Sequence, residues 1–230
     1  MKKIIFLIKS KSTFEVIFFF LLKNIKNIFF KNKFKKFKLL HREFLKNKKI
    51  TEDYFSLNAY NFHLCLSKIK NNFKYLEIGS YEGNSALFVA NNFKNCDLIC
   101  CLDTWKGSDE HTNYNSEVIE KNFDNNLKDY NNINKIKDSS DNFFLQNNNK
   151  FEVIYIDGSH LASQVYKDCM NAWRILKKNG FLICDDYIWH YYRKIKDNPC
   201  FAINTFLRTI KNQYKIFIVT NNQLFIKKII

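Results

Sequence analysis

Short apolar runs alternate with amphipathic stretches along the chain from about residue 75 onward. Five runs have the length and composition of buried strands: 75–78, 98–102, 133–136, 153–156 and 181–184. Helical periodicity fills the intervals: 85–92, 116–127, 141–147, 162–177 and 202–211. Strands separated by helices favour parallel pairing through crossover connections, so the pattern predicts an α/β fold built on a doubly wound sheet.

The C-terminal residues predict an antiparallel hairpin. Strands are expected over 215–220 and 224–228, and Asn221 and Asn222 between them suit a tight turn. The hairpin brings the expected sheet to seven strands. Gly180 follows a Lys-rich helix end, which is the usual position of a C-cap glycine. A linking helix is expected over 51–71.

Charge divides the chain into two parts. Residues 1–50 contain 15 Lys or Arg and two acids, a net charge of +13, whereas residues 51–230 contain 22 basic and 20 acidic residues, a net charge of +2. A uniform compositional bias would not produce this split. The sequence therefore predicts a basic helical N-terminal arm over 1–50 and a folded domain over 51–230.

Apolar residues recur at helical spacing within the arm. They are Phe14, Ile17, Phe18, Leu21, Ile25, Ile28 and Phe29, with lysines among them. Such a helix suits an anionic membrane surface, or it packs on the domain with its basic face in solvent; nucleic acid is a third partner for the charge. The longest apolar run, 16–22, is shorter than the roughly 20 residues that span a bilayer.

The chain has seven cysteines, an odd number, and no Cys-x-x-Cys pair. This pattern argues against a disulfide framework and against a zinc site. Reduced thiols indicate a cytoplasmic protein, and contact through the arm would place it peripherally on the inner face of the membrane.

The first candidate site follows the strand over 75–78. The strand contains the acid Glu77, and the turn after it carries Gly79 and Gly83 and leads into a helix near Ser85. Ligands of a doubly wound sheet bind at the carboxyl ends of its strands, and Gly79 lets the backbone approach one closely. Free amides at the helix start can bind a carboxylate. The glycine spacing does not meet the dinucleotide fingerprint, and a plain strand–turn–helix is the alternative.

Polar turns follow the next two strands as well. Asp103 ends the second strand and can accept hydrogen bonds from two ribose hydroxyls, while Trp105 can cover an adenine or pack in the core. After the third strand, Asp138 and Ser139 can meet the adenine amino group or simply cap the following helix.

Acids also end the fourth and fifth strands: Asp157, followed three residues later by His160, and the pair Asp185 and Asp186. Adjacent parallel strands lie about 4.8 Å apart, so the three carboxylates should converge. They would repel one another unless a cation neutralises them. Hard oxygen ligands in this number suit Mg²⁺, which would lower the pKa of a substrate hydroxyl whose proton His160 can accept. Turn and cap chemistry is the alternative for the paired acids.

From about residue 74 to the C-terminus, these motifs resemble class I S-adenosylmethionine (SAM)-dependent O-methyltransferases. The segment 76–86 looks much like the first motif of the catechol O-methyltransferase group. The resemblance implies a Rossmann-like fold in which Glu77, Tyr81 and Ser85 contact SAM. It also implies that Asp103 holds the ribose and that Ser139 lies near the adenine.

The same resemblance implies that Asp157, Asp185 and Asp186 bind a metal ion. In the catechol group, however, the third ligand is usually Asn, and a catalytic Lys stands at the position of His160. Related sugar O-methyltransferases often carry Asp where this chain has Ser159, which again points to His160 as the base.

The pattern is more similar still to the bacterial branch called methyltransferase family 24. Residues 103–111, 156–160 and 168–186 look typical of that branch. Its members often accompany glycan genes. The resemblance therefore implies methyl transfer to a hydroxyl of a small molecule or a glycan sugar.

Three sets of site residues follow. The expected SAM-binding residues are Glu77, Gly79, Ser80, Tyr81, Gly83, Ser85, Asp103, Thr104, Trp105, Asp138 and Ser139. The expected catalytic residues are Asp157 and His160, and the expected Mg²⁺ ligands are Asp157, Asp185 and Asp186.

Two other functions compete with this one. A nucleic-acid methyltransferase would use the basic arm, but enzymes that methylate base nitrogens carry an Asn/Asp-Pro-Pro-aromatic motif after the fourth strand. Here that place reads Asp-Gly-Ser-His, and the only proline is Pro199. A non-catalytic SAM-binding protein at the membrane is the other alternative, against which the acids and His160 count.

Overall fold

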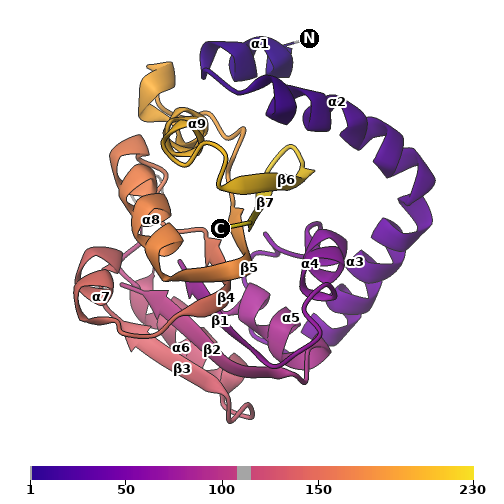
Figure 1. Ribbon diagram of the computed structural model, residues 1–230. Coiled ribbons are helices and arrows are strands. Elements are labelled where there is room, and N and C mark those ends of the chain that lie inside the picture. The colour runs from indigo at the N-terminus through magenta and orange to yellow at the C-terminus, as the bar shows by residue number, and fades with distance from the viewer. Residues whose placement is uncertain (1, 108–114) are drawn as a thin grey trace. The chain divides into compact units, whose positions relative to one another are not determined.

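The computed structural model describes residues 2–107 and 115–230. Seven strands form a sheet in the order β3-β2-β1-β4-β5-β7-β6 (Figure 1). The strands are β1 (Phe73–Ile78), β2 (Cys96–Asp103), β3 (Ile133–Lys137), β4 (Phe151–Ile156), β5 (Leu176–Cys184), β6 (Tyr214–Val219) and β7 (Leu224–Lys228). Strand β7 runs antiparallel to both β5 and β6. The predicted Rossmann-like α/β fold with a C-terminal hairpin is confirmed.

One compact unit, Phe30–Asn147, holds β1 to β3. These strands pair in parallel, β1 with β2 and β2 with β3. The helices of the unit are α3 (Lys31–Leu45), α4 (Ala59–Leu66), α5 (Asn84–Asn92), α6 (Ser116–Leu127) and α7 (Ser140–Gln146). Helix α5 packs on β2, and α3 packs on α4. Because helices cover parallel strands, β1 reads as a nearly continuous buried run.

The other compact unit joins Met1–Phe29 to Asn148–Ile230. Besides β4 to β7 it contains α1 (Lys2–Lys9), α2 (Phe14–Phe29), α8 (Ala162–Ile175), the 3₁₀ helix η1 (Ile195–Asp197) and α9 (Pro199–Thr209). Helix α8 packs on β4, β5 and α9. In the hairpin, the Thr220 amide donates to the Gln223 carbonyl at 2.8 Å, so Asn221 and Asn222 form the predicted tight turn.

The expected linking helix over 51–71 is wrong in extent, because only α4, Ala59–Leu66, is helical there. Its first residues are held by side chains instead of by helical hydrogen bonds. Asp53 Oδ1 accepts from the Ser56 amide at 2.9 Å, and Glu82 Oε2 accepts from the Thr51 amide at 2.6 Å. Local side-chain acceptors of this kind compete with the helix for backbone donors.

The predicted C-cap role of Gly180 is also wrong. Helix α8 ends at Ile175, and Gly180 lies within β5. Leu176 pairs with Phe151 and Phe181 pairs with Val153, so residues 177–180 form a bulge. In that bulge Asn179 takes the left-handed backbone conformation, with φ of 65°. A Cβ on Gly180 would lie 2.6 Å from the Glu152 carbonyl oxygen, so close backbone approach selects the glycine.

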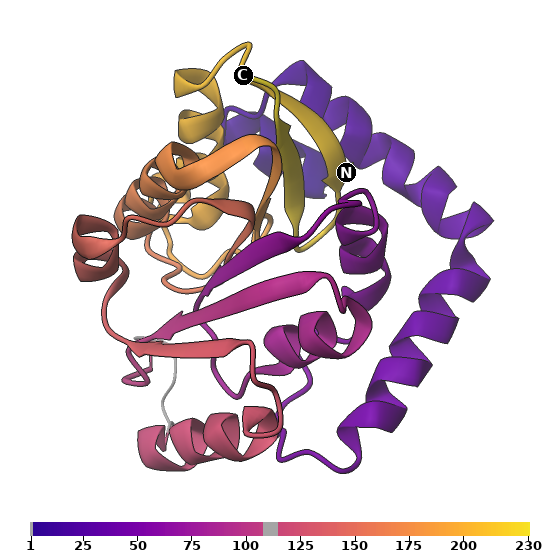
Figure 2. The same cartoon turned by 60° about the horizontal axis from the view of Figure 1, so that its bottom comes forward.

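The N-terminal residues are tied to the C-terminal part of their unit (Figure 2). Asn204 Nδ2 donates to the Ser10 carbonyl at 3.0 Å and to Ser12 Oγ at 2.9 Å. Helix α2 packs on β6 and buries Val16 and Phe20. The apolar residues that the sequence singled out on this helix lie mainly on its other, exposed side. The compact units divide at residue 29, while the domain boundary at residue 50 stays a prediction.

Two sequence expectations concern the whole chain. All seven cysteines are free and buried. Among the described residues, no helix combines the length and the apolar character that crossing a membrane requires. From Ser108 to His111, the 103–111 motif lies outside the described residues.

Candidate active site

The turn after β1 has an unusual backbone. Gly79 and Gly83 have φ of 89° and 81°, and Tyr81 between them has φ of 49°. The Gly79 amide donates to the Leu102 carbonyl at 2.8 Å, which ties the turn to the end of β2. The amides of the other two residues are also paired within the protein: Tyr81 donates to Asp103 Oδ2 at 2.8 Å and Gly83 donates to the Ser80 carbonyl at 2.7 Å. The role of this turn in ligand binding stays a prediction.

Glu77 is fully buried beside this turn. Its Oε2 accepts from Ser85 Oγ at 2.7 Å and from the Tyr75 hydroxyl at 3.0 Å. Its Oε1 and the buried Ser80 Oγ have no hydrogen-bond partner among the described residues. Burial raises the pKa of Glu77 to about 7, against the hydrogen bonds that lower it. Buried polar atoms without partners are rare, so they fit a site that a polar ligand completes.

Asp103 joins the ends of β1 and β2. Its Oδ2 accepts from the Tyr81 amide at 2.8 Å, and its Oδ1 accepts from the Trp105 amide at 2.7 Å. Each carboxylate oxygen can accept a second hydrogen bond. The contacts within the protein therefore fix the carboxylate and leave it able to hold ribose hydroxyls.

Trp105 is buried in the protein rather than open to solvent. Its Nε1 donates to the Tyr81 carbonyl at 2.9 Å, and its ring packs on Phe123 at 4.9 Å between centroids. This geometry favours the packing alternative, in which Trp105 supports the Tyr81 turn. Its neighbour Thr104 accepts a hydrogen bond from the Lys106 amide at 3.2 Å.

The turn after β3 caps helix α7. Ser139 Oγ accepts from the Asn142 amide at 3.2 Å, and Asp138 Oδ1 accepts from Asn142 Nδ2 at 3.0 Å. The capping alternative is thus realised for Ser139, which is the N-cap of α7, while Asp138 supports the turn through the Ser139 amide and the Asn142 side chain. A role for them at an adenine stays a prediction.

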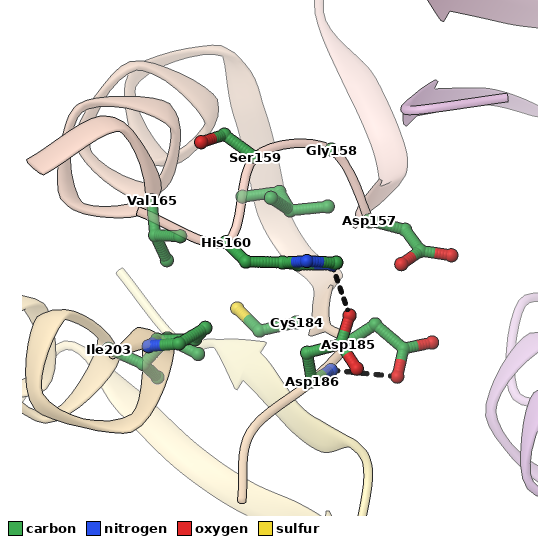
Figure 3. Close-up of a pocket in the computed structure, with 11 residues that line it drawn as sticks. Asp157, Gly158, Ser159, His160, Val165, Cys184, Asp185, Asp186 and Ile203 are labelled. Atoms are coloured by element: carbon green, nitrogen blue, oxygen red, sulfur yellow. Dashed lines mark hydrogen bonds and ion pairs between the residues drawn. The ribbon is translucent and has the colours of Figure 1, made fainter. Parts of the chain in front are cut away.

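A cluster of charged groups lies at the carboxyl ends of β4 and β5. Ile156 pairs with Cys184, which places Asp157 and Asp185 directly after paired residues. Ligand atoms of Asp157, His160 and Asp186 all lie within 4.8 Å of one another. Figure 3 shows these side chains around a pocket to which Val165 and Ile203 add apolar walls. Two carboxylates and an imidazole at this spacing fit a single small cation.

His160 and Asp186 are in direct contact within the cluster. Nε2 of His160 lies 2.7 Å from Oδ2 of Asp186 (Figure 3). Asp186 takes the left-handed conformation, with φ of 52°, which is uncommon for a residue with a side chain. The imidazole also packs against Trp189, at 4.6 Å between ring centroids. The ion pair and the ring contact together hold the ring in its orientation.

Asp185 is held differently from its neighbour. It accepts hydrogen bonds from the Tyr155 hydroxyl, from Gln223 Nε2 at 2.7 Å and from the Asp186 amide at 2.8 Å. Burial raises the pKa of Asp185 to about 7, and the charge of Asp186 adds to this effect. Asp185 lies beside the three converging groups, and its role as a direct metal ligand stays a prediction.

Sequence reasoning missed two residues of the cluster. The Tyr155 hydroxyl also lies 2.7 Å from Asp157 Oδ2, so it contacts the acids that follow two strands. Tyr155 stands two residues before Asp157, on the same side of β4, and a polar tip in an apolar strand was an available signal. Gln223 gave no signal, because it reaches Asp185 only through the pairing of β7 with β5.

Comparisons with known proteins identify the family that the sequence matches. Residues 76–187 match methyltransferase family 24, described as a methyltransferase domain. No curated protein matches the chain significantly. The O-methyltransferase NovP superposes with a TM-score of 0.62 at 12% identity, over 78% of this chain and 84% of that chain. TomG, an O-methyltransferase of tomaymycin synthesis from Streptomyces achromogenes, was solved with SAM. It superposes with a TM-score of 0.58 at 10% identity, over 85% of this chain and 89% of that chain.

A third structure extends the likeness. SMU.1697c from Streptococcus mutans, solved with S-adenosylhomocysteine (SAH), superposes with a TM-score of 0.55 at 14% identity, over 74% of this chain and 97% of that chain. Identities this low establish a shared fold and leave the substrate open. The matched segment runs from Leu76 to Tyr187 and so includes both the Glu77 turn and the acid cluster. Its family and fold make this chain a class I SAM-dependent methyltransferase.

Proposed function

We propose that the enzyme transfers the methyl group of SAM to a hydroxyl oxygen of a small molecule or a glycan sugar, with assistance from Mg²⁺. The observation that carries this proposal is the convergence of Asp157, His160 and Asp186 at the carboxyl ends of β4 and β5. A base paired with carboxylates suits an acceptor that must lose a proton, as a hydroxyl does. NovP and TomG are O-methyltransferases by name.

The Glu77 turn would bind the cofactor. Glu77 Oε1 and Ser80 Oγ supply polar atoms without partners, and Asp103 supplies acceptors for the ribose. The remaining residues of the proposed SAM site are Gly79, Tyr81, Gly83, Ser85, Thr104, Asp138 and Ser139, while Trp105 would support the Tyr81 turn from the core. SAM brings a methyl group on a positively charged sulfur, which is already a strong methyl donor. The protein then contributes mainly by holding the reactants in line.

The cluster would bind the acceptor hydroxyl and take its proton. Asp157 and Asp186, with Asp185 beside them, would hold Mg²⁺, which lowers the pKa of a hydroxyl that it contacts. His160 would accept the hydroxyl proton while the oxygen forms its bond to the methyl carbon. The carbon–sulfur bond breaks in the same step, so the products are the methyl ether, SAH and a protonated His160. Asp186 would stabilise the imidazolium.

Aromatic side chains beside the cluster suggest the shape of the acceptor. Trp189 stacks on Tyr191 with ring centroids 5.3 Å apart and planes inclined by 17°. Tyr192 packs edge-on against both rings. Such a surface suits the face of a sugar or an aromatic ring. The proposed acceptor therefore carries its hydroxyl on a ring.

Formation of SAH tests the proposal. The purified full chain is incubated with SAM and panels of sugars and phenols, in Mg²⁺ or in EDTA, and calorimetry first establishes that SAM binds. We expect acceptor-dependent SAH that EDTA abolishes and that Asp157→Asn and His160→Gln each remove. Asp129→Asn, an exposed carboxylate elsewhere, is the matched control. Turnover that survives in both cluster variants, or that occurs only with RNA, contradicts the proposal.

A further inference from the structure

Helix α2 presents an apolar stripe to solvent. Its members and their exposed fractions are Phe14 84%, Phe18 48%, Leu21 50%, Ile25 51%, Ile28 76% and Phe29 79%. At 100° per residue these six positions fall within about 100° of the helix circumference, so they share one face. Packing within its own compact unit does not account for this face, because the helix buries its opposite side, Val16 and Phe20, and contacts β6.

Positive charge accompanies the stripe. Residues 2–29 contain six lysines and one acid, Glu15. Lys2, Lys3 and Lys9 are exposed on α1, where Ile5 and Ile8 are exposed as well, at 45% and 59%. On α2, Lys26 is exposed beside the stripe. Apolar side chains and lysines therefore occur together on both helices.

We propose that α1 and α2 dock on an anionic lipid surface, with the stripe at the boundary of the acyl chains and the lysines at the headgroups. A basic helix with aromatic and aliphatic residues on one face binds lipid in this manner. Helix α2 has 16 residues, about 24 Å of helix, and no described helix suits a membrane crossing, so the helices would lie along the surface. This inference does not depend on the identity of the methyl acceptor.

The same features argue against other occupants. The phosphates of a nucleic acid would pair with the lysines, but a nucleic acid offers no apolar surface on which the aliphatic side chains of the stripe could be buried. A second copy of the chain would bring its own lysines to the face, and like charges in contact oppose association. An anionic bilayer satisfies the apolar side chains and the lysines together.

Vesicle sedimentation of the full chain tests the proposal. Vesicles of phosphatidylcholine alone are compared with vesicles that also contain phosphatidylglycerol, at low and high salt. The stripe is disrupted by Phe18→Glu with Ile25→Glu, which replace exposed side chains. Leu145→Glu makes the same type of change at a leucine that is 85% exposed on another helix, and it serves as the control. Circular dichroism and SAM binding establish that each variant is folded.

We expect the wild type and Leu145→Glu to bind the anionic vesicles, and the doubly substituted chain to lose about tenfold or more in partitioning. High salt should weaken the binding, because screening removes the contribution of the lysines. The proposal is overturned if no vesicle binds the wild type, or if the folded double variant binds as well as the control. A dimer that the double substitution dissociates, with no vesicle binding, assigns the face to a second copy instead.

Discussion

Nε2 of His160 lies 2.7 Å from Oδ2 of Asp186, and this contact joins the loop after β4 to the turn after β5. The pair gives the imidazole a fixed orientation and a neighbouring negative charge. In the proposed reaction these are the two properties that a general base requires, because the developing imidazolium is stabilised at the place where it forms.

We therefore expect His160→Gln to lower turnover by about 10²- to 10⁴-fold, the usual contribution of a positioned acid or base. Affinity for SAM should remain unchanged, because the proposed cofactor residues all lie between 77 and 139. Asp186→Asn should lower turnover too, and it should shift the pH profile because the imidazolium loses its counter-charge. SAH assays and calorimetry measure the two effects. A His160→Gln enzyme with wild-type turnover would exclude the proposed base.

Metal affinity provides a second prediction. Asp157→Asn removes one charge from the cluster, and we expect the affinity for Mn²⁺, used as a calorimetric substitute for Mg²⁺, to fall by about tenfold or more. Asp129→Asn should bind Mn²⁺ like the wild type. Equal heats for Asp157→Asn and the wild type would show that the cluster does not bind the ion.

The Asp103 carboxylate provides a third prediction. Asp103→Ala removes the acceptor of the Tyr81 and Trp105 amides together with the proposed ribose contacts. We expect the affinity for SAM to fall by about tenfold or more, since hydrogen bonds to a charged group each contribute about 1.5–3 kcal/mol. Asp97→Ala, at an exposed position of the same strand, is the control. Calorimetry with unaltered SAM affinity in Asp103→Ala would remove this residue from the cofactor site.

Burial of Glu77 makes stability depend on pH. Its pKa is about 7 in the folded protein and about 4.5 when the chain is unfolded. Between these values the folded state keeps a proton that the unfolded state has released, so stability falls as pH rises from 4.5 to 7 and then levels off. The free energy of unfolding should fall by about 3 kcal/mol across this pH range because of this buried group.

Glu77→Gln removes this titration. Relative to the variant, the wild type should lose stability between pH 5 and pH 8, as measured by urea unfolding without SAM. Parallel stability profiles for the two proteins would show that the carboxyl is not neutralised by burial.

Gly83 gives a prediction about stability alone. A Cβ at this position would lie 2.6 Å from Leu127 Cδ1, and φ is 81°. We expect Gly83→Ala to reduce the free energy of unfolding by about 1–3 kcal/mol, through backbone strain and overpacking together. Gly107→Ala, at an exposed glycine with φ of 77°, isolates the backbone part. Equal losses in the two variants would show that the contact with Leu127 adds nothing.

The apolar runs predicted the strands well because parallel strands covered by helices leave little else in their sequence. The failures occurred where distant groups decide local structure. Glu82 holds the Thr51 amide from 31 positions away, and the chain becomes helical only at Ala59. Gly180 was predicted to follow a helix end, but it lies in a bulge of β5 against the Glu152 carbonyl, which is distant in the sequence.

In the candidate site as well, features set by local sequence were predictable and features set by distant residues were not. Asp157, Asp185 and Asp186 were predictable because position at a strand end is a property of local sequence. Their different environments were not. Asp185 accepts a hydrogen bond from Gln223, which the C-terminal hairpin places beside it. Asp186 contacts His160 from a left-handed backbone conformation that the local sequence did not predict.

The link from Asn204 to Ser10 and Ser12 has a consequence for the order of folding. It joins residues 194 and 192 positions apart, so the first helices cannot be anchored until nearly the whole chain has been synthesised. The contiguous unit Phe30–Asn147 meets no such delay. Both faces of α2 are therefore exposed during translation. Proteolysis of stalled nascent chains should cleave within the first 29 residues until Asn204 has left the ribosome.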